Sequence, residues 1–353
     1  MITAVLGAYG GIGEEICRML LNVEGIEVRA FGRRQSEAEK ILADIFDKIT
    51  YVNTEPGGIQ EIKNHLENVE ILINAAGIQG EKELEIIRIC RELQIVYLSP
   101  GGQNKEAVQE GCIFDAGSMP GLSLLLPRIL AKSMNEPVAS LEFYYCVQDS
   151  FSRNAARDYI EGLFDEEKKM MVTYENGTFI PFTDQGDFYI PFLEGKKKRY
   201  PFFDKESEFL VKELDLQTGS WFMVLEGEKT MKVLEECRRI YGTDQELAID
   251  KLCRASSLDT FQHGRYSAIY MEMKTENHKG TCLVRCANSA RLTALASVLC
   301  VISLQNHHLK NFGGTFGTLD LSSQIIDHLY DLADEVLWET DENEAGEFLA
   351  GEL

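Results

Sequence analysis

Three glycines near the start of the chain have the spacing of a phosphate-binding loop. Gly7, Gly10 and Gly13 stand between a strand-like stretch, 2–6, and a stretch with a helical apolar face, 13–22. In such loops the first glycine permits a tight turn, the second lets the backbone approach a pyrophosphate, and the third lets the helix pack on the strand. Amide groups at the start of the helix then bind phosphate oxygens. The pattern predicts a dinucleotide site, and a glycine-rich turn without a ligand is the alternative.

The residues expected to hold the cofactor in this loop are Gly7, Tyr9, Gly10, Gly11, Ile12 and Gly13. The choice between NAD and NADP falls at the end of the second strand-like stretch, 27–31, where NAD sites usually carry an acid for the ribose 2′-hydroxyl. Arg33 and Arg34 follow this stretch, and no acid lies at its tip. Guanidinium groups suit a 2′-phosphate, so the sequence favours NADP over NAD. The alternative is that both arginines are solvated loop charges.

These residues require an alternating scaffold to position them, and the first 120 residues have one. Helical patterns separate strand-like stretches at 2–6, 27–31, 49–52, 70–74, 95–98 and 112–114. This order predicts a parallel sheet with helices on both faces, because each parallel crossover needs a long connection. We therefore expect a Rossmann-type, doubly wound α/β domain over 1–121. A segment near 310–340 is a candidate to return to this domain.

The pattern changes after Pro120. A leucine-rich helix at 122–133 is followed by a strand at 140–147, hairpin signals such as Asn176-Gly177, and antiparallel strand patterns at 266–274 and 280–287. These features predict a second, α+β domain with a mixed sheet over 122–309. We expect this domain to supply part of the substrate pocket and a homodimer interface. Residues 341–353 carry five acids and no bases, which predicts a solvated acidic tail.

Composition excludes several classes of partner. The 353 residues carry 57 acids and 35 bases, a net charge of −22, so a broad basic surface for nucleic acid is not expected. No run of 18 apolar residues and no export signal occur, which argues against a membrane protein. The nine cysteines are scattered, which is typical of reduced thiols in the cytoplasm. Cys282 and Cys286 lack a second pair at zinc spacing, so no metal site is expected.

Four ordered stretches resemble the saccharopine dehydrogenase (saccharopine reductase-like) family. They are the glycine loop 7–13, Ile-Leu-Ile-Asn-Ala-Ala-Gly at 71–77, Tyr-Leu-Ser-Pro at 97–100, and Gly-Ser-Met-Pro-Gly-Leu at 117–122. The strand at 143–146, which ends in a cysteine, and more loosely Gly-Gly-Thr-Phe-Gly at 313–317, are also similar. Two positions depart from the family pattern. Met119 replaces an acid, and Cys146 is followed by Val147-Gln148 in place of two glycines.

The resemblance implies hydride exchange between a nicotinamide and an imine or secondary amine of an amino-acid-derived substrate. It places Ala75 and Ala76 on the cofactor side, and Ser99 and Met119 on the substrate side. Tyr97 would donate a hydrogen bond or proton near the imine nitrogen, with packing on the cofactor as the alternative. Cys146 would line the substrate pocket, with a buried structural thiol as the alternative. Tyr97 and Cys146 are therefore the candidate catalytic residues.

Arg153 is a further candidate for substrate binding. It opens a helical stretch at which Ser152 or Asn154 would be the cap, and the helix start together with Arg153 would suit a substrate carboxylate. A short-chain-type carbonyl reductase is the second hypothesis, but it needs Tyr-x-x-x-Lys on a helix. Tyr159 is followed four positions later by a leucine, and Tyr270 with its lysine lies on a predicted strand. A non-catalytic NADP sensor or scaffold is the third hypothesis.

Overall fold

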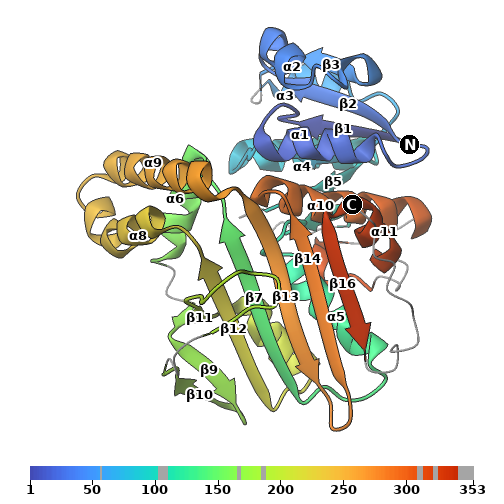
Figure 1. The fold of residues 1–353 in the computed structure, drawn as a ribbon. Coiled ribbons are helices and arrows are strands. Elements are labelled where there is room, and N and C mark those ends of the chain that lie inside the picture. Colours follow the sequence, from blue (N-terminus) through green and yellow to red (C-terminus); the bar gives the residue numbers. More distant parts are fainter. Residues whose placement is uncertain are drawn as a thin grey trace, which may run out of the picture. The chain divides into compact units, whose positions relative to one another are not determined.

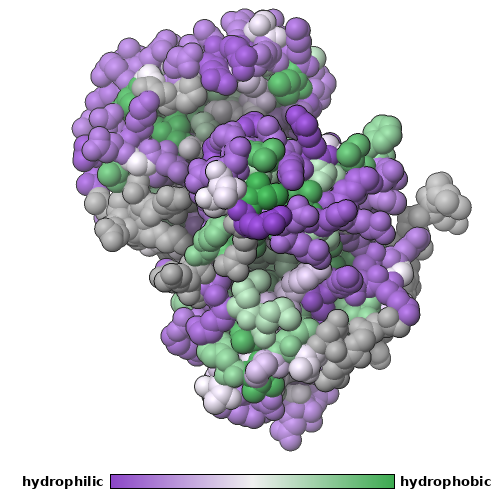
Figure 2. Space-filling view, turned by 90° about the vertical axis from the view of Figure 1, so that its left-hand side faces the viewer, coloured by the Kyte–Doolittle hydropathy of each residue, from purple (hydrophilic) through white to green (hydrophobic). Residues whose placement is uncertain are grey.

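The computed structural model describes residues 1–55, 58–101, 110–164, 168–183, 188–307, 313–320 and 325–340. The chain divides into two compact units (Figure 1). Unit 1 comprises Met1–Leu125 and Ala290–Ala333, and unit 2 comprises Leu126–Ser289 and Asp334–Leu353. Figure 2 shows one face of the molecule, on which hydrophilic residues predominate and hydrophobic residues form smaller patches. The predicted acidic tail, 341–353, lies outside the described residues.

Unit 1 contains a parallel sheet whose strands follow the order β15-β6-β5-β4-β1-β2-β3. The strands β2 and β3 lie on one side of β1, and the later strands of the sheet lie on the other side. The strand order therefore reverses between β1 and β4. In doubly wound folds this reversal, at the carboxyl ends of the strands, is where ligands bind. The strands are β1 (Ile2–Leu6), β2 (Glu27–Gly32), β3 (Thr50–Asn53), β4 (Val69–Asn74), β5 (Val96–Leu98), β6 (Cys112–Phe114) and β15 (Gly314–Thr315). The predicted Rossmann-type sheet is thereby confirmed.

The helices of unit 1 come from both ends of the chain. They are α1 (Gly11–Leu20), α2 (Gln35–Ile41), α3 (Ile59–Asn64), α4 (Glu81–Glu92), the start of α5 (Leu122–Ser133), most of α10 (Ser289–His307), and α11 (Ile325–Leu332). The short 3-10 helices η1 (Phe46–Lys48) and η3 (Phe316–Thr318) complete the set. In addition, β15 pairs with β6 at the edge of the sheet.

The assignment of α10 to unit 1 differs from the predicted second domain, which extended to residue 309. Inside unit 1, Ser297 Oγ donates to the Ala116 carbonyl at 2.7 Å, and Arg291 forms an ion pair with Glu15 at 3.2 Å. Most of the helix is buried, which explains its strongly apolar sequence. The apolar sequence of α10 indicates a buried helix, but it does not indicate which of the two units the helix belongs to.

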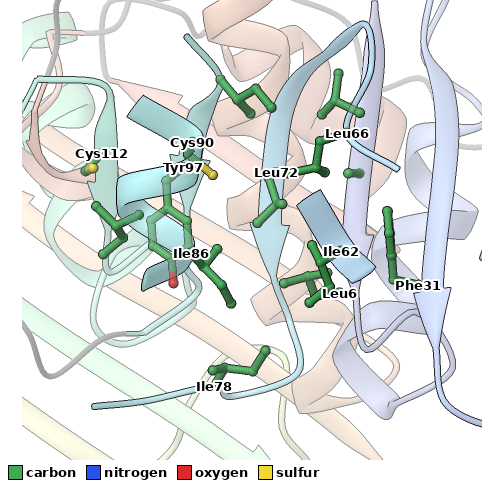
Figure 3. Packing of buried hydrophobic residues seen from close by; sticks show 14 of the residues in the cluster. Leu6, Phe31, Ile62, Leu66, Leu72, Ile78, Ile86, Cys90, Tyr97 and Cys112 are labelled. Carbon is green, nitrogen blue, oxygen red and sulfur yellow. The ribbon is translucent and has the colours of Figure 1, made fainter. Parts of the chain in front are cut away.

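The core on one face of the unit 1 sheet is formed by strand residues and by side chains of α3 and α4 (Figure 3). Leu6, Leu72 and Tyr97 come from adjacent regions of the sheet, and Ile62 and Ile86 come from the covering helices. All five are at most 2% exposed. Burial of side chains of this size is the main stabilising contribution to such a layer. It also fixes the strand ends from which the loops emerge.

Unit 2 contains a mixed sheet in the order β10-β9-β12-β7-β13-β14-β16, to which β11 and β8 are attached through β12. The pair β7–β12 is parallel, and the other pairs of this sheet are antiparallel. The strands are β7 (Ser140–Gln148), β8 (Lys169–Met170), β9 (Val172–Glu175), β10 (Thr178–Pro181), β11 (Tyr200–Phe203), β12 (Thr218–Leu225), β13 (Tyr266–Lys274), β14 (Lys279–Cys286) and β16 (Glu335–Thr340). The predicted mixed sheet is confirmed.

The helices of unit 2 are α6 (Arg153–Gly162), α7 (Lys205–Glu213), α8 (Glu228–Tyr241) and α9 (Gln245–His263), apart from the end of α5. A separate apolar cluster joins α6, α8 and α9, and it includes Ile160, Cys237 and Leu252. Asp259 of α9 caps the start of α8, because its carboxylate accepts hydrogen bonds from the amide and hydroxyl of Thr230, each at 2.7 Å. Within the part of the chain that the structure describes, no helix has the length and apolar character needed to cross a bilayer.

Candidate dinucleotide-binding site

The glycine loop connects β1 to α1 at the point where the strand order of unit 1 reverses. Gly7 has a φ of +77°, a conformation that favours glycine, and the amides of Gly7 and Ala8 both donate to the Phe31 carbonyl, at 3.0 and 3.1 Å. A Cβ on Gly7 would lie 2.7 Å from the Ala76 Cα, and one on Gly13 would lie 2.1 Å from the Gly7 carbonyl oxygen. The backbone therefore packs so closely here that these two positions exclude a side chain.

The first turn of α1 presents backbone amides at the sheet edge. The first hydrogen bond of the helix runs from the Glu14 amide to the Gly10 carbonyl at 2.8 Å, and Gly10 provides no side-chain cap. The amides of Gly11, Ile12 and Gly13 consequently have no acceptor among the described residues. Unpaired amides at a helix start bind anions, because the helix dipole adds positive potential there. The predicted loop residues thus form a site suited to a phosphate group.

A buried polar network holds the neighbouring loop after β4. The Asn74 side chain donates to the Ile78 carbonyl at 2.8 Å and accepts from the Ile78 amide at 3.2 Å, which fixes the turn that contains Ala75 and Ala76. The same Asn74 amide group donates to the Tyr97 hydroxyl at 2.9 Å, and this hydroxyl donates to the Glu83 carboxylate at 2.9 Å. Ala75 and Ala76 therefore sit on a rigid turn, with Ala76 directly against Gly7.

This network contradicts the predicted catalytic role of Tyr97. Its side chain belongs to β5 and is fully buried in the core (Figure 3). Burial, together with the nearby Glu83 carboxylate, raises the pKa of Tyr97 far above the ordinary value of a phenol. A hydroxyl that is enclosed and already donates to Glu83 cannot pass a proton to a bound substrate. Tyr97 instead positions the loop through Asn74.

The two arginines after β2 are both exposed, as the predicted cofactor contact requires. Arg34 forms an ion pair with Glu37 at 2.6 Å, and a hydrogen bond with Tyr9 raises the pKa of Arg34 above its ordinary value. Arg33 has no hydrogen-bond or ion-pair partner in the described part of the chain. An exposed guanidinium without a partner at the end of a strand is available to an anion.

Ser99 and Met119 lie on the same edge of unit 1 as the glycine loop. Ser99 follows β5 and is buried, with its amide bonded to the Ile113 carbonyl at 2.9 Å and its carbonyl accepting from the Ala116 amide at 3.0 Å. Met119 follows β6 and is half-buried. Their positions at the carboxyl ends of parallel strands agree with a place near a bound ligand. Their role in substrate binding stays a prediction.

Cys146 does not have the environment of a catalytic thiol. It lies on β7 in the apolar cluster of unit 2, where Tyr144, Val224 and Ala268 are also buried, and it is 0% exposed. Burial is the main cause that raises the pKa of Cys146 well above that of an ordinary thiol, and the Glu226 carboxylate adds to the rise. The thiol therefore stays protonated near neutral pH. The alternative stated for it, a buried structural thiol, fits the structure.

Arg153 is the first residue of α6, and it is bound by acids of its own unit. Its guanidinium forms ion pairs with Glu246 and Asp250 of α9. Ser152 caps the same helix, because its Oγ accepts from the Ala155 amide at 3.2 Å. Two carboxylates already pair with Arg153, so a substrate carboxylate would have to displace them. The role of Arg153 as the receptor of such a carboxylate stays a prediction.

Three residues of this region escaped the sequence analysis. Asn74 was quoted only as part of a motif, Glu83 is a buried acid in the first turn of α4, and Tyr51 packs beside the end of β2. The one signal for Glu83 was its spacing of three and four residues from Ile86 and Ile87, which places it on the apolar face of the helix. No spacing rule could have joined it to Tyr97, because the two residues meet only across the helix–sheet interface.

Together, the reversal of strand order, the closely packed glycine loop and the unpaired amides define a dinucleotide-binding α/β unit of the Rossmann type. A family model for short chain dehydrogenases matches residues 1–92. No curated protein is similar enough in sequence to match the chain.

Among solved structures, the chain is similar to an apo saccharopine dehydrogenase (L-Glu forming) from Saccharomyces cerevisiae. The TM-score is 0.64 at 10% identity, with 96% of this chain and 99% of that chain covered. A short-chain dehydrogenase/reductase from Veillonella parvula in complex with NADP covers 28% of this chain and 46% of that chain, at 17% identity and a TM-score of 0.25. The first likeness extends over both units, and at this identity it shows a shared fold.

Proposed function

We propose that the chain is an NADPH-dependent oxidoreductase that exchanges hydride with an imine or secondary amine of an amino-acid-derived substrate. The observation that carries the proposal is the loop edge of unit 1, where three amides of α1 are unpaired and the exposed Arg33 guanidinium, which follows β2, has no partner among the described residues. The likeness of fold to a saccharopine dehydrogenase over almost the whole of both chains supports the substrate class.

The residues present fit a bound dinucleotide. Gly7, Gly10 and Gly13 allow the backbone of the loop to turn and pack closely, and the first turn of α1 would hold the pyrophosphate. Arg33 would bind the 2′-phosphate, and Arg34 would add positive charge beside it. When bound, a reduced nicotinamide would supply hydride chemistry at the imine carbon, and the imine nitrogen would take up the electron pair of the C=N bond. A protonated imine needs no further proton, so the burial of Tyr97 and Cys146 is compatible with this reaction.

Binding experiments test the cofactor part. Fluorescence titration of the wild-type chain should give an affinity for NADPH that exceeds the affinity for NADH by about tenfold or more. Arg33→Ala should reduce that ratio, because it removes the guanidinium that has no partner in the protein. Equal affinity of the wild type for both dinucleotides would contradict the NADPH assignment.

Turnover tests the substrate class. NADPH oxidation is followed over pairs of amino acids and oxo acids that form imines in solution, and at least one pair should be reduced. Reduction of simple ketones alone, with no turnover of any amine pair, would favour a short-chain-type carbonyl reductase. The match of residues 1–92 to the short chain dehydrogenase model supports that alternative, but no Tyr-x-x-x-Lys lies on a described helix.

A second candidate function is a non-catalytic NADP sensor or scaffold. One observation favours it: Tyr97, Cys146 and Arg153, the side chains expected to act on a substrate, are all buried or neutralised within their own units. NADPH binding at micromolar affinity without turnover of any amine or carbonyl pair would establish this function in place of the enzyme.

We also propose a homodimer that associates through unit 2, and, on the sequence alone, a cytoplasmic location. Leu258 and Phe261 of α9 are 54% and 91% exposed, and gathered apolar side chains on a surface mark contact sites. Light scattering coupled to size exclusion should give twice the mass of the chain. Phe261→Ser should shift the distribution towards the monomer, and a monomeric wild type would contradict the dimer.

A further inference from the structure

Gly32, the last residue of β2, lies against two tyrosine side chains. A Cβ built on Gly32 would lie 2.5 Å from Cε1 of Tyr9 and 2.8 Å from the hydroxyl oxygen of Tyr51. Separations below 3.0 Å essentially never occur for real Cβ atoms. A side chain at position 32 therefore requires one or both tyrosines to move, although the backbone of Gly32 itself is in an ordinary conformation.

Position 32 is where cofactor choice is made in folds of this type. The acid that binds the ribose 2′-hydroxyl in NAD-binding Rossmann units stands at the tip of the second strand. Here that tip adjoins the glycine loop, because β2 pairs with β1 and the Phe31 carbonyl accepts from the Gly7 and Ala8 amides. An acid at position 32 would thus face the ribose, if there were room for its side chain.

We propose that Tyr9 and Tyr51 exclude an acidic side chain from position 32, and so prevent the contact with the ribose 2′-hydroxyl that NAD-binding units make. Their side chains fill the space that an acid at position 32 would need, and they leave the ribose 2′ position to Arg33 and Arg34. This inference rests on the proposed function, because it assumes that a dinucleotide binds at the glycine loop.

Both tyrosines are held in place by contacts outside the loop. Tyr9 lies beside the Arg34 guanidinium, which in turn is paired with Glu37. The Tyr51 ring packs on Phe46 with ring centroids 5.5 Å apart. The Tyr51 hydroxyl is buried and has no hydrogen-bond partner among the described residues. A phenylalanine would pack equally well without an unpaired hydroxyl, so the oxygen beside Gly32 points to a role at that position.

The test combines four variants with two measurements. Gly32→Asp, Tyr9→Ser, the double variant Tyr9→Ser/Gly32→Asp, and the double variant with Tyr51→Phe added are compared with the wild type. Dissociation constants for NADPH and NADH come from fluorescence titration, and the midpoint of thermal unfolding reports whether each variant is folded. Tyr9→Ser is the matched control, because it opens the space without introducing an acid.

We expect Gly32→Asp alone to lower the unfolding midpoint and to weaken the binding of both dinucleotides by about tenfold or more. Tyr9→Ser alone should stay folded and keep a preference for NADPH, because Arg33 and Arg34 remain. The double variant should recover the midpoint and bind NADH at least about tenfold more tightly than the wild type does. Adding Tyr51→Phe to the double variant should increase that gain, since it removes the second blocking atom.

Two outcomes would overturn the inference while the proposed function stands. In one, Gly32→Asp alone keeps the wild-type midpoint of thermal unfolding and prefers NADH, which would show that the tyrosines do not exclude an acid from position 32. In the other, the folded double variant gains no affinity for NADH. If the wild type binds neither dinucleotide, the proposed function itself fails and this inference fails with it.

Discussion

Polar groups at the loop edge of unit 1 and two polar side chains of unit 2, Arg153 and Asp259, are used in opposite ways. At the edge, the first-turn amides of α1 and the Arg33 guanidinium have no partners among the described residues. In unit 2, Arg153 is paired with two acids, and the buried Asp259 carboxylate accepts hydrogen bonds from Thr230. Unpaired groups can bind a ligand, whereas paired groups stabilise their own unit. Substitutions at the edge should therefore change ligand binding, and those in unit 2 should change stability alone.

The largest effect is expected for Gly7→Ala. The new Cβ would overlap the backbone of Ala76, and Gly7 also has a positive φ. Overpacking and the left-handed conformation together should lower the free energy of unfolding by roughly 3 kcal/mol. Urea denaturation gives the loss of stability, and titration should show loss of NADPH binding.

The matched control for this substitution is Gly77→Ala. Gly77 has a similar φ of +64°, but nothing lies within 4 Å of the position of its missing Cβ. Only the conformational cost of about 1–2 kcal/mol should appear there. Equal losses in the two variants would show that close packing at Gly7 contributes nothing to the loop.

The next largest effect is expected in unit 2, for Asp259→Ala. The carboxylate accepts from the Thr230 amide and hydroxyl and is paired with Lys229 at 3.6 Å, so its removal should lower the free energy of unfolding by about 2 kcal/mol. NADPH affinity should stay at the wild-type value. If Asp259→Ala is folded but no longer binds NADPH, the proposed difference between the loop edge of unit 1 and these side chains of unit 2 is contradicted.

The same carboxylate should make stability depend on pH. Burial alone would raise the pKa of Asp259, but the hydrogen bonds from Thr230 and Lys229 outweigh it and lower the pKa below its ordinary value. The stabilisation is therefore complete above the ordinary carboxyl pKa of about 4, and it is lost as the pH falls towards the lowered pKa. The stability gap between wild type and Asp259→Asn, which cannot titrate, should narrow in urea denaturation series below about pH 4.

Tyr97→Phe separates positioning from catalysis. It removes the hydrogen bond to Glu83 and the one from Asn74, so we expect a loss of about 1 kcal/mol in unfolding free energy and weaker NADPH binding. Glu83→Gln, which keeps an acceptor for the tyrosine hydroxyl, should retain more of the affinity. If Tyr97→Phe has wild-type stability and affinity but loses turnover, the catalytic role would be restored.

The fold of unit 1 was largely predictable from the sequence, because its strands are short apolar runs and its loop glycines have a fixed geometric purpose. The α9 helix was missed for a physical reason. Its buried face mixes Ile249 and Leu252 with small and polar residues such as Ser256 and Asp259, whereas Leu258 and Phe261 are exposed. Hydrophobic periodicity finds a helix only when its apolar face is the buried one.

The parts of the site that backbone geometry defines were predictable from the sequence. The parts that depend on the direction of a side chain were not. The glycines and the arginines after β2 follow from their positions in the chain. Tyr97 and Cys146 lie on strands, where neighbouring side chains point to opposite faces, so a shift of one position decides between core and ligand. The partners that neutralise Arg153 lie about 90 residues away on α9, and no local pattern indicates them.

The smallest effect is expected for Arg153→Gln. Its ion pairs with Glu246 and Asp250 are exposed, and pairs of this kind contribute little to stability, so the urea midpoint should hardly move. The KM of any amino-acid-derived substrate should also stay unchanged, because the guanidinium is already neutralised. Arg33→Gln is the matched control, since it removes another exposed arginine, one that has no partner among the described residues, and it should weaken NADPH binding. A rise of tenfold or more in substrate KM for Arg153→Gln, with NADPH affinity intact, would show that a substrate carboxylate displaces the two acids. Ligand binding would then extend to a group that is paired in the structure, and the contrast between the two regions would no longer hold.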